Sequence, residues 1–150
     1  SYHNSNTKYQ LPNFNKGKQF SADYDKNHEL KIVMLGKIFN TNLSASWVFS
    51  SGRPFTSLEN LYVESGTGYE IFSKNEYNNK RIKSSHHLDI SIVKSLEISK
   101  VGIEIGFSIY NLYNRKNIAH KRYNPFSREL SMKDISMFGI TPSIFTKVHF

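Results

Sequence analysis

Five stretches of about ten residues, in which apolar and polar side chains alternate, limit the possible folds of this chain more than any other feature. Successive side chains of a β-strand point to opposite faces, so an alternation with a period of two predicts strands rather than helices. In the clearest stretch, one face carries only apolar side chains, those of Val101, Ile103, Ile105, Phe107 and Ile109. The pattern predicts an all-β chain with strands over about 27–38, 43–52, 86–96, 101–114 and 140–150.

The lengths of these strands and of the segments between them predict their arrangement. Ten residues that rise about 3.3 Å each and tilt by about 45° cover roughly 24 Å, close to the apolar band of about 25 Å in outer-membrane barrels. Soluble strands average only about five to six residues. The connections alternate between short turns, near 39–42 and 97–100, and long polar loops at about 1–26, 53–85 and 115–139. This alternation is typical of a membrane barrel built as an antiparallel up-and-down meander.

Composition and charge exclude several other classes of protein. Hydrophobic residues make up only 38% of the chain and aromatic residues 14%, and rings suit strands and the boundary between water and lipid. No stretch approaches the roughly 18 consecutive apolar residues of a spanning helix. The chain has no Cys, which excludes disulfides and thiolate metal sites. The net charge is +8, and the excess of Lys and Arg lies mainly in the long loops.

Five strands cannot close a membrane barrel. At about 4.8 Å per strand they make a ribbon roughly 24 Å wide, whereas the smallest membrane barrels have about eight strands. A ribbon with an apolar face and two open edges would aggregate in water. The last stretch, Ile140–Phe150, keeps most of its apolar side chains on one face and ends on an aromatic ring. We therefore expect the C-terminal section of a larger transmembrane β-barrel.

Several motifs, in the same order, resemble the C-terminal part of TonB-dependent outer-membrane receptors. They are GKQFSADYDKNHEL at 17–30, WVFSSGRPFT at 47–56, HLDIS at 87–91, SIYNLYNRKN at 108–117 and the terminal Phe150. The similarity extends from about residue 14 to residue 150, with one departure at Ile118, where the family would have Pro.

The resemblance implies a location, a function and a set of partners. Members of this family are barrels of about 22 strands with a plugged lumen in the outer membrane of Gram-negative bacteria. They import scarce ligands such as siderophores, cobalamin or glycans, with energy that TonB delivers to a box on the plug. These 150 residues contain neither plug nor box. We therefore expect barrel wall and loops that meet outer-membrane lipid, lipopolysaccharide, the barrel-assembly machinery, and the remainder of the barrel with its plug.

Two sets of residues are predicted to serve the membrane location. The apolar side chains of the second and fourth strands are predicted to contact lipid: Trp47, Phe49, Ile103, Ile105, Phe107 and Ile109. The resemblance implies that the terminal strand carries the signal that the assembly machinery reads, formed by Ile144, Val148 and Phe150. Edge pairing is a suitable mechanism, because backbone hydrogen bonds give affinity and alternate side chains give specificity.

The last long loop is predicted to face the ligand. Clustered Lys and Arg side chains can attract anionic ligands or the phosphates of lipopolysaccharide. The residues concerned are Arg115, Lys116, Lys121, Arg122, Tyr123 and Arg128.

No metal, cofactor or catalytic site is predicted. The segment 23–27 begins like a calcium loop but has His28 where Gly is needed. His86 and His87 are neighbours on a predicted strand and point to opposite faces, whereas His87 and Asp89 share the predicted lumenal face, where we expect a hydrogen-bonded pair. No nucleophile elbow, phosphate loop or catalytic triad is recognisable, so we expect no enzymatic activity.

Two soluble architectures remain as alternatives. A five-stranded OB-like barrel that binds nucleic acid fits the strand number, the basic charge and the aromatic content. It needs rings beside Lys and Arg, whereas Trp47, Phe49 and Phe107 lie among Leu, Ala and Ile. We therefore expect no nucleic-acid partner. A surface β-sandwich that acts as a binding module is the other alternative.

Overall fold

The protein is all-β. The structure is a computed structural model that describes residues 1–57, 60–63, 70–73, 76–99, 101–123 and 132–150. Strands make up its regular structure apart from one short 3-10 helix, η1 (Asn15–Gly17).

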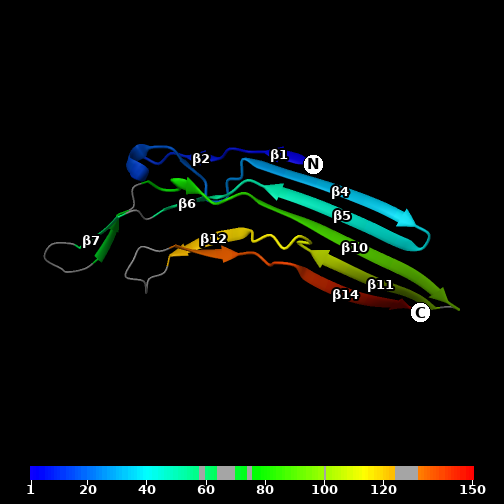
Figure 1. Ribbon diagram of the computed structural model, residues 1–150. Coiled ribbons are helices and arrows are strands. Elements are labelled where there is room, and N and C mark those ends of the chain that lie inside the picture. The colour runs from blue at the N-terminus through cyan, green and yellow to red at the C-terminus, as the bar shows by residue number, and fades with distance from the viewer. Residues whose placement is uncertain (58–59, 64–69, 74–75, 100, 124–131) are drawn as a thin grey trace.

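Six antiparallel strands form the main sheet, in the order β1-β4-β5-β10-β11-β14 (Figure 1). Each long strand pairs with its neighbours in chain order, as the predicted meander requires. The predicted strands are confirmed, with ends that differ by a few residues. The observed bounds are β1 (Tyr2–Asn4), β4 (His28–Ile38), β5 (Thr41–Ser50), β10 (Ser85–Ile98), β11 (Val101–Tyr110) and β14 (Thr141–His149).

The sixth strand corrects the prediction of about five strands. β1 lies within the segment 1–26 that was predicted to be a loop, and it pairs with the first residues of β4. Its three residues are too few to show an alternation, so the pairing depends on contacts with β4. The Tyr2 hydroxyl lies 2.7 Å from Nδ1 of His28, and the two rings stack with centroids 6.1 Å apart.

The long loops also contain more structure than the sequence predicted. Among the described residues, four small two-stranded sheets occupy them: β2 (Lys8–Tyr9) with β3 (Phe20–Ser21), β6 (Pro54–Phe55) with β9 (Lys80–Arg81), β7 (Asn60–Val63) with β8 (Glu70–Ser73), and β12 (Ile118–Tyr123) with β13 (Met132–Ser136). They lie beyond one end of the main sheet, which we call the loop end (Figure 1). Strands of two to six residues give little periodic signal, which is why the sequence did not reveal them.

Two tight turns lie at the opposite end of the sheet, the turn end. Phe39 and Asn40 join β4 to β5, and Ser99 follows β10 at the same end. Phe39 and Ser99 have positive φ angles of 50° and 60°. The predicted alternation of short turns and long loops, at opposite ends of the sheet, is therefore confirmed (Figure 1).

The strand register places apolar side chains on one face of the sheet. Phe107 lies opposite Ile92 on β10 and Ile144 on β14. Trp47 lies opposite Ile32 and Leu88 in the same way. We call the side of the sheet that carries these residues the apolar face. It includes every second residue counted from them along each strand. The other side, which includes Ser44, Asp89 and Ser108, is the polar face.

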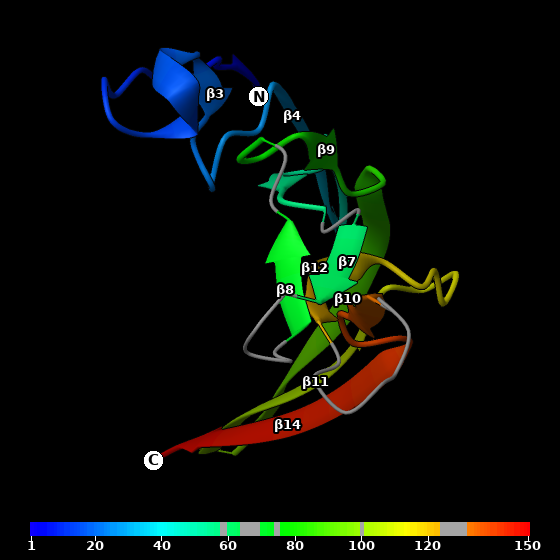
Figure 2. The ribbon, with the colours of Figure 1, turned by 90° about the vertical axis from the view of Figure 1, so that its left-hand side faces the viewer.

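The main sheet is a single curved layer, seen from the loop end in Figure 2. Its edges, β1 and β14, do not pair with each other, so the described residues form neither a closed small barrel nor two packed sheets. Among the described residues, the buried apolar side chains are those of Phe20, Ala22 and Pro54, and all three lie at the loop end. The sheet therefore has no hydrophobic core of its own within the described part of the chain.

Candidate functional site

Apolar side chains dominate the apolar face of the sheet. On the five long strands it carries one charged side chain, that of Lys94. Lys94 lies four residues before the end of β10 at the turn end, and a Lys side chain can extend along an apolar surface to place its ammonium group in water. The polar face, in contrast, carries Glu29, Lys31, Lys37, Asp89, Glu97, Glu104 and Lys147.

All six residues that were predicted to contact lipid lie on this apolar face: Trp47, Phe49, Ile103, Ile105, Phe107 and Ile109. Ile105 and Phe107 are 42% and 43% exposed, which is high for apolar side chains in the middle of a sheet. Ile144 and Val148 of the predicted assembly signal lie on the same face, and the ring of Phe150 beyond β14 is fully exposed. Large exposed apolar patches are typical of surfaces that contact a partner or a membrane.

Aromatic rings collect where the apolar face meets the loop end. Trp47 and Phe49 stack with ring centroids 6.2 Å apart, and Trp47 lies 6.1 Å from the ring of His86. The Tyr113 hydroxyl is 2.7 Å from Nδ1 of His86. Rings with a polar atom suit a boundary at which one side is apolar and the other is water.

Asn111 ends β11 and holds the turn that follows it. Its side chain is completely buried. The side-chain amide donates to the carbonyl oxygens of Arg115 at 2.9 Å and Phe138 at 3.1 Å, and its oxygen accepts from the Arg115 backbone amide at 3.1 Å. The backbone amide of Asn111 donates to a carboxylate oxygen of Asp89 at 2.9 Å. These bonds tie the turn to β10 and to the segment that enters β14.

Asn117 extends the sheet with its side chain. It accepts a hydrogen bond from the backbone amide of His86 at 3.1 Å and donates to the carbonyl oxygen of His86 at 2.9 Å. The Asn117 amide group thus takes the place of a paired strand residue beside β10. Arg115 donates to the same Asn117 oxygen at 3.1 Å and to the carbonyl oxygen of Ser84 at 3.4 Å. The guanidinium group of Arg115, which was predicted to face a ligand, therefore belongs to this network.

The other predicted loop residues are distributed around β12. Lys121 forms an ion pair with Asp134 at 2.6 Å, and its ammonium group lies 5.4 Å from the ring centroid of Phe55. Arg128 lies outside the described residues. The remaining three side chains are exposed or half-buried: Lys116, Arg122 and Tyr123. The structure therefore brings Lys121, rather than Arg115, to the surface between β6 and β12.

His87 and Asp89, which were predicted to share a face and to form a hydrogen-bonded pair, both lie on the polar face. Nε2 of His87 lies 3.4 Å from a carboxylate oxygen of Asp89. The His87 ring also packs against Tyr110, with centroids 4.8 Å apart. Within the described residues no group of three or more His, Cys, Asp or Glu side chains is placed to hold a metal ion.

Segment 7–25 docks on the two-stranded sheet β6–β9 through a buried ion pair. The side chain of Asp25 is completely buried and is paired with the guanidinium group of Arg81. The Thr7 amide donates to the same carboxylate at 2.9 Å. Burial raises the pKa of the Asp25 carboxyl group, but the hydrogen bond from Thr7 and the charge of Arg81 outweigh burial and hold this pKa below its ordinary value.

Aromatic and polar contacts complete this docking. The ring of Phe20 lies 5.2 Å from Phe14 and 5.3 Å from Tyr77, between centroids. Asp23 accepts hydrogen bonds from the Tyr77 hydroxyl at 3.2 Å and from the Asn78 side chain at 2.7 Å. The loop end therefore contains a small folded module that joins the first and second predicted loops, and sequence reasoning did not identify it.

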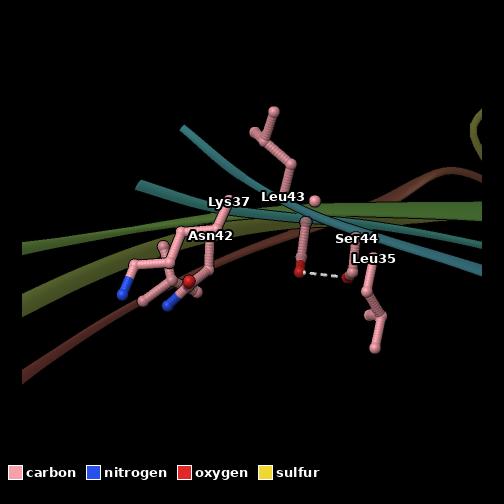
Figure 3. A pocket seen from close by; sticks show the side chains of 8 residues that line it. Leu35, Lys37, Asn42, Leu43 and Ser44 are labelled. Carbon is pink, nitrogen blue, oxygen red and sulfur yellow. Dashed lines mark hydrogen bonds between the residues drawn. The ribbon is translucent and has the colours of Figure 1, made fainter. Parts of the chain in front are cut away.

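A hollow of about 490 Å³ lies on the sheet at the turn end. Figure 3 shows that Leu35 and Ser44 project to one side of the sheet there and Leu43 to the other, with a hydrogen bond of 2.8 Å between the hydroxyls of Ser44 and Ser91. The hollow is a shallow part of the uncovered sheet. It has no convergent set of charged or nucleophilic groups.

Two glycines show a constraint that the alternation pattern did not reveal. A Cβ atom on Gly52 would lie 1.6 Å from the carbonyl oxygen of Ile82, so only Gly fits where β6 approaches β9. A Cβ atom on Gly106 would lie 2.0 Å from the ring of Phe145, which covers this glycine on the polar face. A glycine inside a strand is a general signal for such a close approach.

The contact between Gly106 and Phe145 supports a double-mutant test. Gly106→Ala is expected to lower the free energy of unfolding by about 1–2 kcal/mol, because the ring must leave its position. In a Phe145→Ala background the same change is expected to cost close to nothing. Urea unfolding of the four proteins in the cycle measures the coupling. Additive effects would show that the ring does not depend on Gly106.

Comparisons of the chain with protein-family models, with curated proteins and with solved structures found no match. No helix among the described residues has the length and apolar character needed to cross a membrane.

Proposed function

We propose that this chain forms the C-terminal section of a transmembrane β-barrel in the outer membrane of a Gram-negative bacterium. The barrel would be a receptor similar to the TonB-dependent importers. Its apolar face would contact lipid, and its polar face would line the lumen. The observation that carries the proposal is the apolar face itself. It extends over five long strands, and no described residue covers it.

Strand length supports this orientation. A transmembrane β-strand needs about 9–11 residues. The strands β4, β5, β11 and β14 have 11, 10, 10 and 9 residues, and β10 has 14. In water, Ile32, Met34 and Ile144 would remain 48%, 63% and 76% exposed. In a bilayer the same side chains lie in an apolar medium, and β5, β10 and β11 each pair with a strand on both sides, which suits a lipid environment.

The tight turns at one end of the sheet and the long loops at the other support the proposed orientation in the membrane. The turns at Phe39 and Ser99 would face the periplasm, and the short strand pairs of the loop end would face outward. The free edges of β1 and β14 would pair with the remaining strands of the barrel, and Ile144, Val148 and Phe150 would present β14 to the assembly machinery. The polar face would enclose the plug, through which TonB would act. The cargo would be a scarce ligand such as a siderophore, cobalamin or a glycan, and the chain would have no catalytic role.

Cysteine accessibility on one strand tests the orientation. Ile105 and Glu104 are neighbours on β11 and point to the apolar and polar faces, and the chain contains no Cys that would react in their place. In the full-length protein in outer membranes, Ile105→Cys is expected to react with a lipid-soluble maleimide and to resist a charged one. Glu104→Cys is expected to show the opposite preference, or to become reactive toward the charged reagent once the lumen is opened.

Equal reactivity of both positions toward the charged reagent would contradict the proposal. The behaviour of the purified chain gives a second criterion. A monomer that stays soluble without detergent would favour the β-sandwich module, because a lipid-facing sheet would aggregate under these conditions.

A further inference from the structure

A cavity of about 220 Å³ lies at the loop end, next to the last residues of the polar face. Ser50 and Ser85, which pair with each other across β5 and β10, form its floor. Arg53 and Lys83 stand at its wall, together with Lys26 and backbone from the segment around Ala119. The lining therefore combines cationic groups with hydroxyl groups.

The charge of this cavity is not neutralised by its own lining. Lys26 is paired with Glu29 at 2.6 Å, so these two charges cancel. Arg53 donates to the carbonyl oxygen of Ala119 at 2.9 Å, which is a neutral acceptor. Among the described residues, no carboxylate lies within ion-pair distance of the Arg53 or Lys83 side chain. Two positive charges thus remain available in the cavity.

The position of Arg53 is fixed. Gly52 before it lies against the carbonyl oxygen of Ile82, and the Ile82 amide donates to the carbonyl oxygen of Arg53 at 3.0 Å. A second cavity, of about 180 Å³, shares Arg53, Ile82 and Ala119 with the first. Asp23 in that second cavity is held by Tyr77 and Asn78. The guanidinium group is therefore held at the junction of two cavities by backbone contacts and not by an acid.

We propose that Arg53 and Lys83 form an oxyanion-binding site, which takes a phosphate or carboxylate group and completes its coordination with the hydroxyl of Ser85. A guanidinium group matches the two oxygens of such a group, and charge-assisted hydrogen bonds are the stronger kind. The site therefore predicts that the ligand of the proposed receptor is an anion. The idea that this anion is the imported cargo rests on the proposed function, whereas the binding of an anion to the site does not.

Binding of inorganic phosphate and of citrate to the purified full-length protein, measured by isothermal titration calorimetry, tests the site. The variant Arg53→Gln/Lys83→Gln is expected to weaken binding of at least one probe by about tenfold or more, as the loss of charge-assisted hydrogen bonds predicts. The control Lys16→Gln/Lys133→Gln removes the same net charge from exposed positions at the same end. It is expected to bind as the unmodified protein does.

Three results would overturn the site. The first is that the unmodified protein binds neither probe, and the second is that the cavity variant binds as well as the unmodified protein. The third is that binding weakens equally in the control, which would mean a general effect of net charge. If the cavity variant fails to fold, Lys83→Gln alone serves as the test. It keeps the contact of Arg53 with Ala119 and is still expected to weaken binding. The calorimetry is independent of the cysteine labelling, so phosphate binding with failed labelling would retain the site and remove the membrane orientation.

Discussion

Phe107→Arg is expected to lower the free energy of unfolding in lipid by about 2–4 kcal/mol and to reduce the amount of protein in the outer membrane, because it places a charge on the lipid face near the middle of the bilayer. Phe107 lies in the centre of the apolar face, between Ile92 and Ile144. Urea unfolding in lipid vesicles and quantification of the protein in outer-membrane fractions measure the two effects.

The neighbouring residue supplies the matched control. Ser108 lies on the same strand and points to the polar face, so Ser108→Arg adds the same side chain on the proposed lumenal side and is expected to have little effect. The control also separates the competing architectures. In a sheet exposed to water, Arg at the 43% exposed position of Phe107 would be tolerated, and equal tolerance of both changes would count against the membrane location.

Arg81→Met is expected to destabilise the docking of segment 7–25 by about 3 kcal/mol, because it leaves the carboxylate of Asp25 buried without a counter-charge. Arg81 also donates to the carbonyl oxygens of Asp25 and Gly52, at 3.2 Å and 3.0 Å. Hydrogen exchange of the Thr7 amide, which donates to the Asp25 carboxylate, reports the loss. Lys133→Met is the control, since it removes an exposed positive charge at the same end of the sheet that pairs with no described acid.

The Asp25 pair also predicts a dependence on pH. The pKa of Asp25 is lower in the folded protein than in the unfolded chain, where it is about 3.9. Folding is therefore stabilised by this group at pH values above about 4, and the contribution is lost as the pH falls through the lower, folded value. Protection of the Thr7 amide is expected to be constant between about pH 5 and 7 and to fall below about pH 4. In Asp25→Asn this acid-dependent loss should be absent, and its persistence would assign the effect to another carboxyl group.

Alternation along single strands allowed much of the sheet to be predicted. The apolar run from Val101 to Ile109 identified its face because side-chain direction in a strand is a local property of the backbone. The tight turns and the pairing of consecutive strands followed from connection length. The same logic placed Trp47 and Phe107 on one face, although the two residues lie on strands that do not pair.

Contacts between distant segments could not be predicted in this way. Asp25 and Arg81 are 56 residues apart, and His86 and Asn117 are 31 residues apart. Neither pair has a periodic signature, because each depends on how two loops meet at the loop end. Arg115 illustrates the limit: its charge suggested ligand binding, whereas its guanidinium group donates to Asn117 and Ser84.

The sequence alone therefore determined the strand content, the apolar face and the division into a turn end and a loop end, because these depend on side-chain alternation and chain connectivity. Only the tertiary structure showed β1, the docking of segment 7–25 through Asp25, and the cavity beside Arg53. Each of these depends on backbone groups and charges that are separated along the chain and come together only when the loops fold.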